Sequence, residues 1–160
     1  MPSVPPQPVR ICIASTPAHL PIVRSAVGEI CRLIGFRDSS VDSVVLAVDE
    51  ALANIIKHAY EGQQDQPIEV TFAALWEAGV QSGLEVVLED RGKTVDFAKL
   101  HGRDLDDVRP GGLGTHIMTA CMDHLNYAPR AGGGTRLTMI KYLRETPADR
   151  ETQLTGGSRG

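Results

Sequence analysis

The sequence predicts an α+β sandwich with a largely antiparallel sheet. Three segments with apolar residues at helical spacing are flanked and separated by short apolar segments that are typical of strands. The resulting order is strand, helix, helix, strand, strand, loop, helix, strand. The two middle strands are joined by a short connection, which favours antiparallel pairing. A doubly wound parallel sheet fits this order poorly.

Composition indicates one globular domain. The chain has 160 residues, of which 42% are hydrophobic and 22% charged, enough for one core. A net charge of -4 and the lack of a Lys/Arg run with interleaved aromatics argue against direct binding of nucleic acid. No stretch reaches the roughly 20 apolar residues of a membrane span, and the start, "MPSVPPQPVR", lacks the apolar core of a secretory signal. We therefore expect a cytoplasmic protein without a membrane segment.

The two ends of the chain differ from its middle. Residues 1–8 are rich in proline, and residues 144–160 are polar with several glycines, so we expect flexible termini around a domain at 9–143. The three cysteines contain no CxxC pair and are odd in number, which disfavours a disulfide framework and a zinc site. They are Cys12, Cys31 and Cys121, and we expect them to be small apolar residues of the interior.

The first strand and helix are clear in the pattern. The alternating segment "VRICIA", residues 9–14, predicts a strand, and the following "TPAHLPIVRSAVGEICRLIGF" predicts a helix. Gly35 should end that helix, because glycine is the usual residue after a helix C-terminus. The apolar residues at helical spacing are Leu20, Val23, Val27, Ile30 and Ile34.

The second helix contains the stretch "DEALANIIKHAY". Ser39 or Ser40 should cap its start. One side carries the apolar stripe Val41, Val44, Val45, Val48, Leu52, Ile55, Ile56 and Ala59. The other side carries Glu50, Asn54 and Lys57. These three residues are either solubilising groups on a solvated face or one wall of a ligand site, and the helix alone leaves both readings open.

A hairpin follows. The segments "IEVTFAALW" and "GLEVVLED" predict two strands joined around residues 77–82. Alternation places Asp90 on the same face as Leu84, Val86 and Leu88. A carboxylate at the end of an apolar row is costly unless a donor meets it, and Gly92 would let the backbone approach a flat ligand. The alternative is that "DRG" is a plain turn.

A glycine loop precedes the third helix. In "RPGGLGTHIMTACMDHL", three glycines lead into an apolar stripe, and a helix N-terminus after a flexible loop favours anions. The stripe is Ile117, Met118, Cys121, Met122 and Leu125. The loop is neither a P-loop nor a GxGxxG fingerprint. The long polar segment at 93–110 is typical of a lid or a binding loop. The segment "GTRLTMIKYL" predicts the last strand.

Together and in this order, the elements resemble the Bergerat ATP-binding fold of histidine kinases, Hsp90-type chaperones and type II topoisomerases. More closely, "LAVDEALANIIKHAY", "DRGKTVDF", "GGLGTHIMTACMDHLNY" and "TRLTMIKYL" resemble the anti-sigma factor serine kinases of bacterial partner-switching systems, from Val9 to Leu143. The resemblance implies a two-layer sandwich of a mixed, mostly antiparallel sheet with helices on one face.

The resemblance also assigns roles to the residues of the second helix and of the "DRG" motif. Glu50 matches the family's general base, and Asn54 matches its magnesium ligand. Lys57 and His58 match nucleotide-side positions where related kinases often have these residue types. Asp90 matches the carboxylate that accepts from the adenine amine.

Other positions match the family's glycines and the residues around them. Gly92 matches the glycine beside the base, and Thr135 a residue near the adenine pocket. The "GGLGT" motif supplies the phosphate side with Gly112, Leu113, Gly114 and Thr115. The family's common "PGF" after the DxG motif is replaced here by "KTV", which changes the hinge of the lid.

The resemblance implies a function. It is that of an ATP- and Mg²⁺-dependent protein serine/threonine kinase that acts as an anti-sigma factor and phosphorylates a serine of an anti-anti-sigma antagonist. It also implies a homodimer, for which the segment "VRICIA" and the following helix are the expected surface. The alternative is a non-catalytic, ATP-dependent partner-binding regulator. The catalytic domain of a histidine kinase fits less well, since no helical dimerisation segment with a phosphoacceptor histidine is visible in the sequence.

Overall fold

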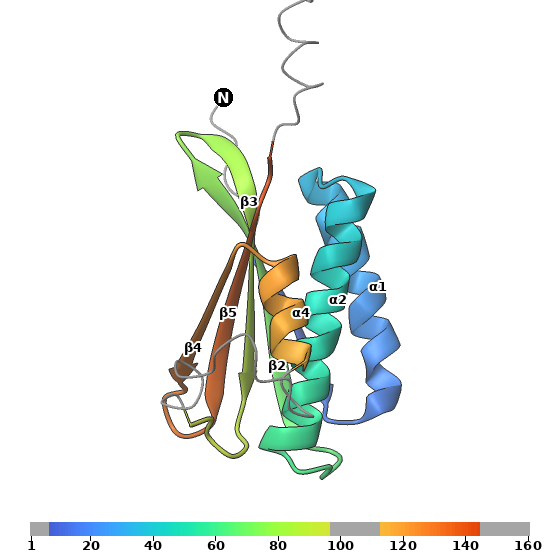
Figure 1. Cartoon of the computed structure of the whole chain (residues 1–160), viewed down its shortest axis with the longest axis vertical. Helices are drawn as coiled ribbons and strands as arrows, with labels where there is room; N and C mark the ends of the chain where they lie inside the picture. Colours follow the sequence, from blue (N-terminus) through green and yellow to red (C-terminus); the bar gives the residue numbers. More distant parts are fainter. Residues whose placement is uncertain (1–6, 97–112, 145–160) are drawn as a thin grey trace, which may run out of the picture.

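The chain folds into two layers, with helices packed on one face of a five-stranded sheet (Figure 1). The computed structural model describes residues 7–96 and 113–144. The strands are β1 (Val9–Ala14), β2 (Pro67–Glu77), β3 (Val80–Asp90), β4 (His124–Pro129) and β5 (Thr135–Tyr142). The helices are α1 (Leu20–Ile34), α2 (Asp38–Asn54) and α4 (Leu113–Cys121), with a 3-10 turn at Pro17–His19 and a π turn at Ile55–Ala59. The expected α+β class and two-layer arrangement are confirmed.

The sheet has the order β1-β2-β3-β5-β4. All four pairings among the described strands are antiparallel, so the parallel component of the expected mixed sheet is not found in this part of the chain. The turn between β2 and β3 consists of Ala78 and Gly79, with φ values of 50° and 79°. Positive φ at both central residues suits a two-residue hairpin, because such turns follow the twist of the strands.

The core lies between the helices and the sheet. α2 packs between α1 and α4 over the sheet (Figure 1). α1 ends where the sequence predicts, at Gly35, whose φ of 101° lies in the left-handed region that favours glycine. The largest fully buried side chains come from all three helices and from β2, β3 and β5: Leu52, Ile68, Leu84, Leu88, Met118, Met139, Val23, Val27, Val41, Val44, Val48 and Val70.

Both ends of α2 differ from the expectation. The helix begins at Asp38, with Arg37 at the N-cap, so neither Ser39 nor Ser40 caps it. Asp38 in the first turn places a negative charge beside the positive end of the helix dipole. At the other end the α-helix stops at Asn54 and widens into the π turn, in which Tyr60 N donates to Ile55 O at 3.0 Å. π turns of this kind are frequent at functional sites.

The prediction of the third helix is wrong at its C-terminal end. α4 stops at Cys121, and the stretch "HLNYAP", which the expected helix entered, forms the edge strand β4. Leu125 therefore faces the core from a strand and does not extend a helical stripe. The chain leaves the helix because Asp123 joins the sheet, donating from its backbone N to Ile140 O and accepting from Tyr142 N, both at 2.8 Å.

Within residues 7–96 and 113–144, no helix is long and apolar enough to cross a membrane.

Candidate active site

A cavity of about 190 Å³ opens where the end of α2 meets the ends of β3 and β5. Its floor continues the buried apolar row of the sheet through Leu88 and Leu137, which are cross-strand partners. The polar groups around it are few and come from separate elements, as is typical of small-molecule sites. The lining residues are Ala51, Asn54, Ile55, His58, Ala59, Leu88, Asp90, Val95, Thr115, Tyr127, Thr135 and Leu137.

Asp90 is the buried charge of this cavity. Its side chain ends the row of Leu84, Val86 and Leu88, as the alternation predicts, and only 3% of the residue is exposed. Burial raises the pKa of Asp90, and the backbone amides of Gly92 and Thr135 partly oppose that shift. Gly92 N donates to Asp90 Oδ1 at 2.9 Å. The carboxylate keeps further acceptor capacity toward the cavity, because each of its oxygens has two lone pairs.

Gly92 is more than part of a plain turn. A Cβ atom at this position would lie 2.4 Å from Ala59 O, so the backbone after β3 lies directly against the π turn. Lys93 N donates to the same carbonyl at 2.8 Å. The close approach requires glycine, and it fixes the distance between Asp90 and the end of α2.

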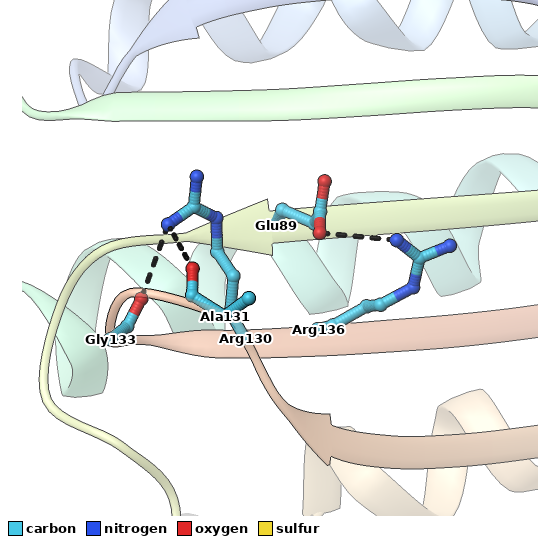
Figure 2. Close-up of polar contacts among 5 residues, drawn as sticks. All are labelled: Glu89, Arg130, Ala131, Gly133 and Arg136. Carbon is cyan, nitrogen blue, oxygen red and sulfur yellow. Dashed lines mark hydrogen bonds and ion pairs between the residues drawn. The ribbon is translucent and has the colours of Figure 1, made fainter.

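The turn between β4 and β5 supports Asp90 from the other side. A Cβ atom on Gly134 would lie 1.9 Å from Asp90 O, and Gly134 has a φ of 95°. Figure 2 shows the guanidinium of Arg130 directed at this turn, where Nη1 donates to Ala131 O at 3.2 Å and to Gly133 O at 3.4 Å. The "GGG" stretch therefore packs as a tight backbone turn against the residue that carries the buried carboxylate.

A second cavity, of about 210 Å³, adjoins the first. Asn54 and His58 line both cavities, so the end of α2 and the π turn separate them. The second cavity is more polar because Glu50 and Lys57 also face it. Its lining residues are Glu50, Ala53, Asn54, Lys57, His58, Gly114 and Ile117.

Gly114 brings α4 close to α2 at this point. A Cβ atom on Gly114 would lie 2.9 Å from Glu50 Oε2 and 3.3 Å from Asn54 Nδ2. A glycine here keeps the carboxylate and the amide accessible beside the first turn of α4. Glu50, Asn54 and Lys57 thus form the wall of a cavity, which favours the ligand-site reading over a merely solvated face.

The structure gathers most of the residues that the sequence singled out. Thr115 and Thr135 line the first cavity, and Thr135 Oγ1 accepts from Val95 N at 3.3 Å. Leu113 begins α4, while its side chain, Gly112 and most of the expected lid at 93–110 lie outside the described residues. Gly92 lines neither cavity and acts through Asp90 and Ala59.

Tyr127 is the polar lining residue of the first cavity that the sequence analysis missed. It lies on β4, opposite Leu137, and reaches the first cavity from the sheet. The overlooked signal is the alternation of inward Leu125 and Tyr127 with outward His124 and Asn126, which has the period of a strand. The helical stripe that precedes β4 concealed this short alternation.

The two cavities suit one ligand with two chemically different parts. The first, with apolar walls and a buried carboxylate, fits a flat group that carries a hydrogen-bond donor. The second, beside the N-terminus of α4 and Lys57, fits an anionic group, because backbone N–H groups and an ammonium both favour negative charge. Glu50 supplies the one carboxylate among the residues that line the second cavity.

The chain is similar to known proteins over most of its length. The model of the family "Histidine kinase-like ATPase domain" matches residues 13–141. Among curated proteins, the chain is similar to the serine-protein kinase RsbW of Bacillus pumilus, with 25% identity over 91% of this chain and 92% of that protein. It is similar also to RsbW of Listeria monocytogenes serovar 1/2a, with 26% identity over 86% of this chain and 88% of that protein.

Two solved structures share the fold. The RsbU and RsbW domains of Rv1364c from Mycobacterium tuberculosis superpose with a TM-score of 0.62 at 22% identity, covering 89% of this chain and 34% of the other. The SiaB–SiaC complex from Pseudomonas aeruginosa contains a chain with a TM-score of 0.57 at 14% identity, covering 83% of this chain and 88% of the other. At these identities the likeness concerns the fold alone.

Proposed function

Because this chain belongs to the histidine kinase-like ATPase family, we propose that it is an ATP-dependent protein serine kinase that acts as an anti-sigma factor. It would bind adenine in the first cavity and the phosphates in the second. Its acceptor would be a serine of an anti-anti-sigma antagonist. The curated relatives named serine-protein kinase RsbW support the reaction class, since they match along about nine tenths of this chain.

One observation carries the proposal. Glu50, Asn54 and Gly114 meet at the second cavity, and Asp90 lines the adjoining first cavity. The absence of a side chain on Gly114 leaves room beside the Glu50 carboxylate. A carboxylate in that place can serve an acceptor hydroxyl, whereas a site for nucleotide binding alone has no need of it. The presence of Glu50 therefore favours a kinase.

The proposed step is a transfer of the γ-phosphoryl group. Glu50 accepts the proton of the serine hydroxyl as the serine oxygen forms a bond to the γ-phosphorus. The bond from that phosphorus to the β-γ bridging oxygen breaks, and ADP keeps the electron pair. Lys57, which lines the same cavity, would stabilise the negative charge on the phosphates.

The donor set fits Mg²⁺. Asn54 contributes an amide oxygen at the boundary of the two cavities, and Mg²⁺ prefers oxygen ligands with the remaining positions filled by water and phosphate. Bound there, the ion would neutralise phosphate charge during the transfer. Asn54 would hold it, and Glu50 would remain available for the hydroxyl.

A non-catalytic regulator remains the second candidate. The same cavities would then bind ATP, and the bound nucleotide would only set the shape of the partner-binding surface. Transfer itself separates the two proposals. The purified chain is incubated with γ-labelled ATP, Mg²⁺ and candidate antagonist proteins, and label on an antagonist serine is the expected result. Binding of ATP without transfer to any antagonist would favour the regulator.

Asp90→Asn is expected to weaken ATP binding while the fold persists. The substitution removes the charge that accepts from the adenine amine, and a hydrogen bond to a charged group contributes about 1.5–3 kcal/mol. Calorimetric titration with Mg-ATP measures the loss. The matched control is Glu89→Gln, on the opposite face of β3, where the carboxylate pairs with Arg136 at 3.2 Å (Figure 2). An unchanged affinity in Asp90→Asn would contradict the assignment of the adenine pocket.

The homodimer is proposed at β1 and α1. β1 is an edge strand of the sheet, and Ile22 on α1 is 62% exposed. We expect the chain to sediment as a dimer at tens of micromolar, an order-of-magnitude range in which such assemblies persist. Ile22→Asp should shift it toward monomer. Val80→Asp, in the β2–β3 turn region at 68% exposure, should not. A monomeric parent chain at that concentration would count against the dimer.

A further inference from the structure

Tyr127, on β4, lines the first cavity. Tyr127 contacts the apolar floor at Leu137, its cross-strand partner, and packs against the core. Across the sheet, Leu88, Leu137 and Tyr127 form one row on three neighbouring strands. Asp90 stands two residues beyond Leu88 on β3. The carboxylate and the phenol thus border the floor from the two outer strands of the row.

The spacing of this row suits a planar base. Two interstrand spacings place the backbones of β3 and β4 about 10 Å apart. The floor between them is apolar, because Leu88 and Leu137 are 1% and 4% exposed. A flat ring on that floor would have Asp90 at one edge and Tyr127 at another.

The phenol of Tyr127 has no hydrogen-bond partner among the residues that the structure describes. The other polar groups of the sheet side are engaged: Asp90 accepts from Gly92 N, and Thr135 Oγ1 accepts from Val95 N. Burial raises the pKa of Tyr127 to about 12, so the hydroxyl keeps its proton at any physiological pH. The hydroxyl oxygen of Tyr127 is not among the buried unpaired atoms of the described residues, so it is accessible to a ligand, and a tyrosine hydroxyl in a binding site usually takes a hydrogen-bond partner.

We propose that Tyr127 is a second base-recognition residue of this site, whose hydroxyl donates a hydrogen bond to an unprotonated ring nitrogen of the bound adenine. The inference rests on the proposed function, because it requires the base to occupy the first cavity. Adenine has three such acceptor nitrogens, N1, N3 and N7. Asp90 would accept a hydrogen bond from the adenine amine and Tyr127 would donate one to a ring nitrogen, so the two residues together would recognise a donor and an acceptor of the same base.

The test compares Tyr127→Phe with the parent chain in Mg-ATP titrations. The substitution removes only the hydroxyl, and affinity for ATP should fall about three- to tenfold, as expected for one neutral hydrogen bond. Tyr142→Phe, at the far end of β5 and outside this cavity, is the control and should bind as the parent does. Thermal unfolding of each variant checks that the fold is intact.

ATP analogues with altered adenine rings identify the nitrogen that accepts the hydrogen bond from Tyr127. Parent and Tyr127→Phe are titrated with 1-deaza-, 3-deaza- and 7-deaza-ATP, each of which lacks one acceptor nitrogen. The difference between the two proteins should disappear with one analogue and persist with the other two. Equal affinity of both proteins for ATP, or a loss that persists with all three analogues, would overturn the inference. Neither result touches the proposed function, which is tested separately by ATP binding to the parent chain and by phosphate transfer to an antagonist.

Discussion

Glu50→Ala is expected to lower phosphate transfer about 10²- to 10⁴-fold, the range that a general base contributes, and to leave the affinity for Mg-ATP near that of the parent. The reason is the place of the carboxylate. Glu50 lines the second cavity and is absent from the lining of the first. It would therefore act on the acceptor hydroxyl and would not contact the adenine. Phosphate incorporation into the antagonist measures the first quantity, and calorimetry the second.

Asn54→Ala should be compared with Glu50→Ala, because the two residues are proposed to have different roles. Asn54 lines both cavities and is proposed to hold the metal that ATP brings, so its loss should reduce both nucleotide binding and transfer. Asp42→Ala, an exposed carboxylate near the start of α2, is the control for removing a charge from the same helix and should change neither quantity. If Glu50→Ala transferred phosphate as fast as the parent, Glu50 would not be the general base of the reaction.

Gly134→Ala is expected to have the largest effect on stability. The added methyl group would lie 1.9 Å from Asp90 O, and the residue holds a φ of 95°, where an L side chain is strained. Left-handed strain costs roughly 1–2 kcal/mol, and overpacking typically costs about 1–3 kcal/mol. We therefore expect the free energy of unfolding to fall by about 2–5 kcal/mol, and denaturant unfolding measures it.

Gly133→Ala separates the cost of backbone strain from the cost of the contact with Asp90. Gly133 has a φ of 103° but nothing within 4 Å of its missing Cβ, so Gly133→Ala should show only the strain of the backbone conformation. The difference between the two variants then isolates the contact with Asp90. Equal losses in both would show that the turn moves away from β3 without cost. Weaker ATP binding by Gly134→Ala, measured where the variant is folded, would link the same contact to the site.

Local patterns predicted much of the fold. The 3.6-residue spacing from Leu20 to Ile34 and the glycine after it define α1, and the alternation that ends at Asp90 defines the buried face of β3. These features depend on residues within a few positions of one another, because a helix or a strand buries one face through its own periodicity. β4 escaped prediction because its alternation is only six residues long and directly follows the apolar stripe of α4.

The sequence by itself determined the α+β class through local periodicity. Its motifs, through their resemblance to a kinase family, marked Glu50, Asn54, Asp90 and Gly114 as candidate residues. Only the tertiary structure decided that these residues border two adjoining cavities, that the end of α2 widens into a π turn between them, and that Tyr127 joins the site. The physical reason is that the contacts which build the site join residues far apart in the sequence. Gly92 against Ala59 and Gly134 against Asp90 are contacts between segments more than thirty positions apart, and such contacts depend on how the helices pack on the sheet.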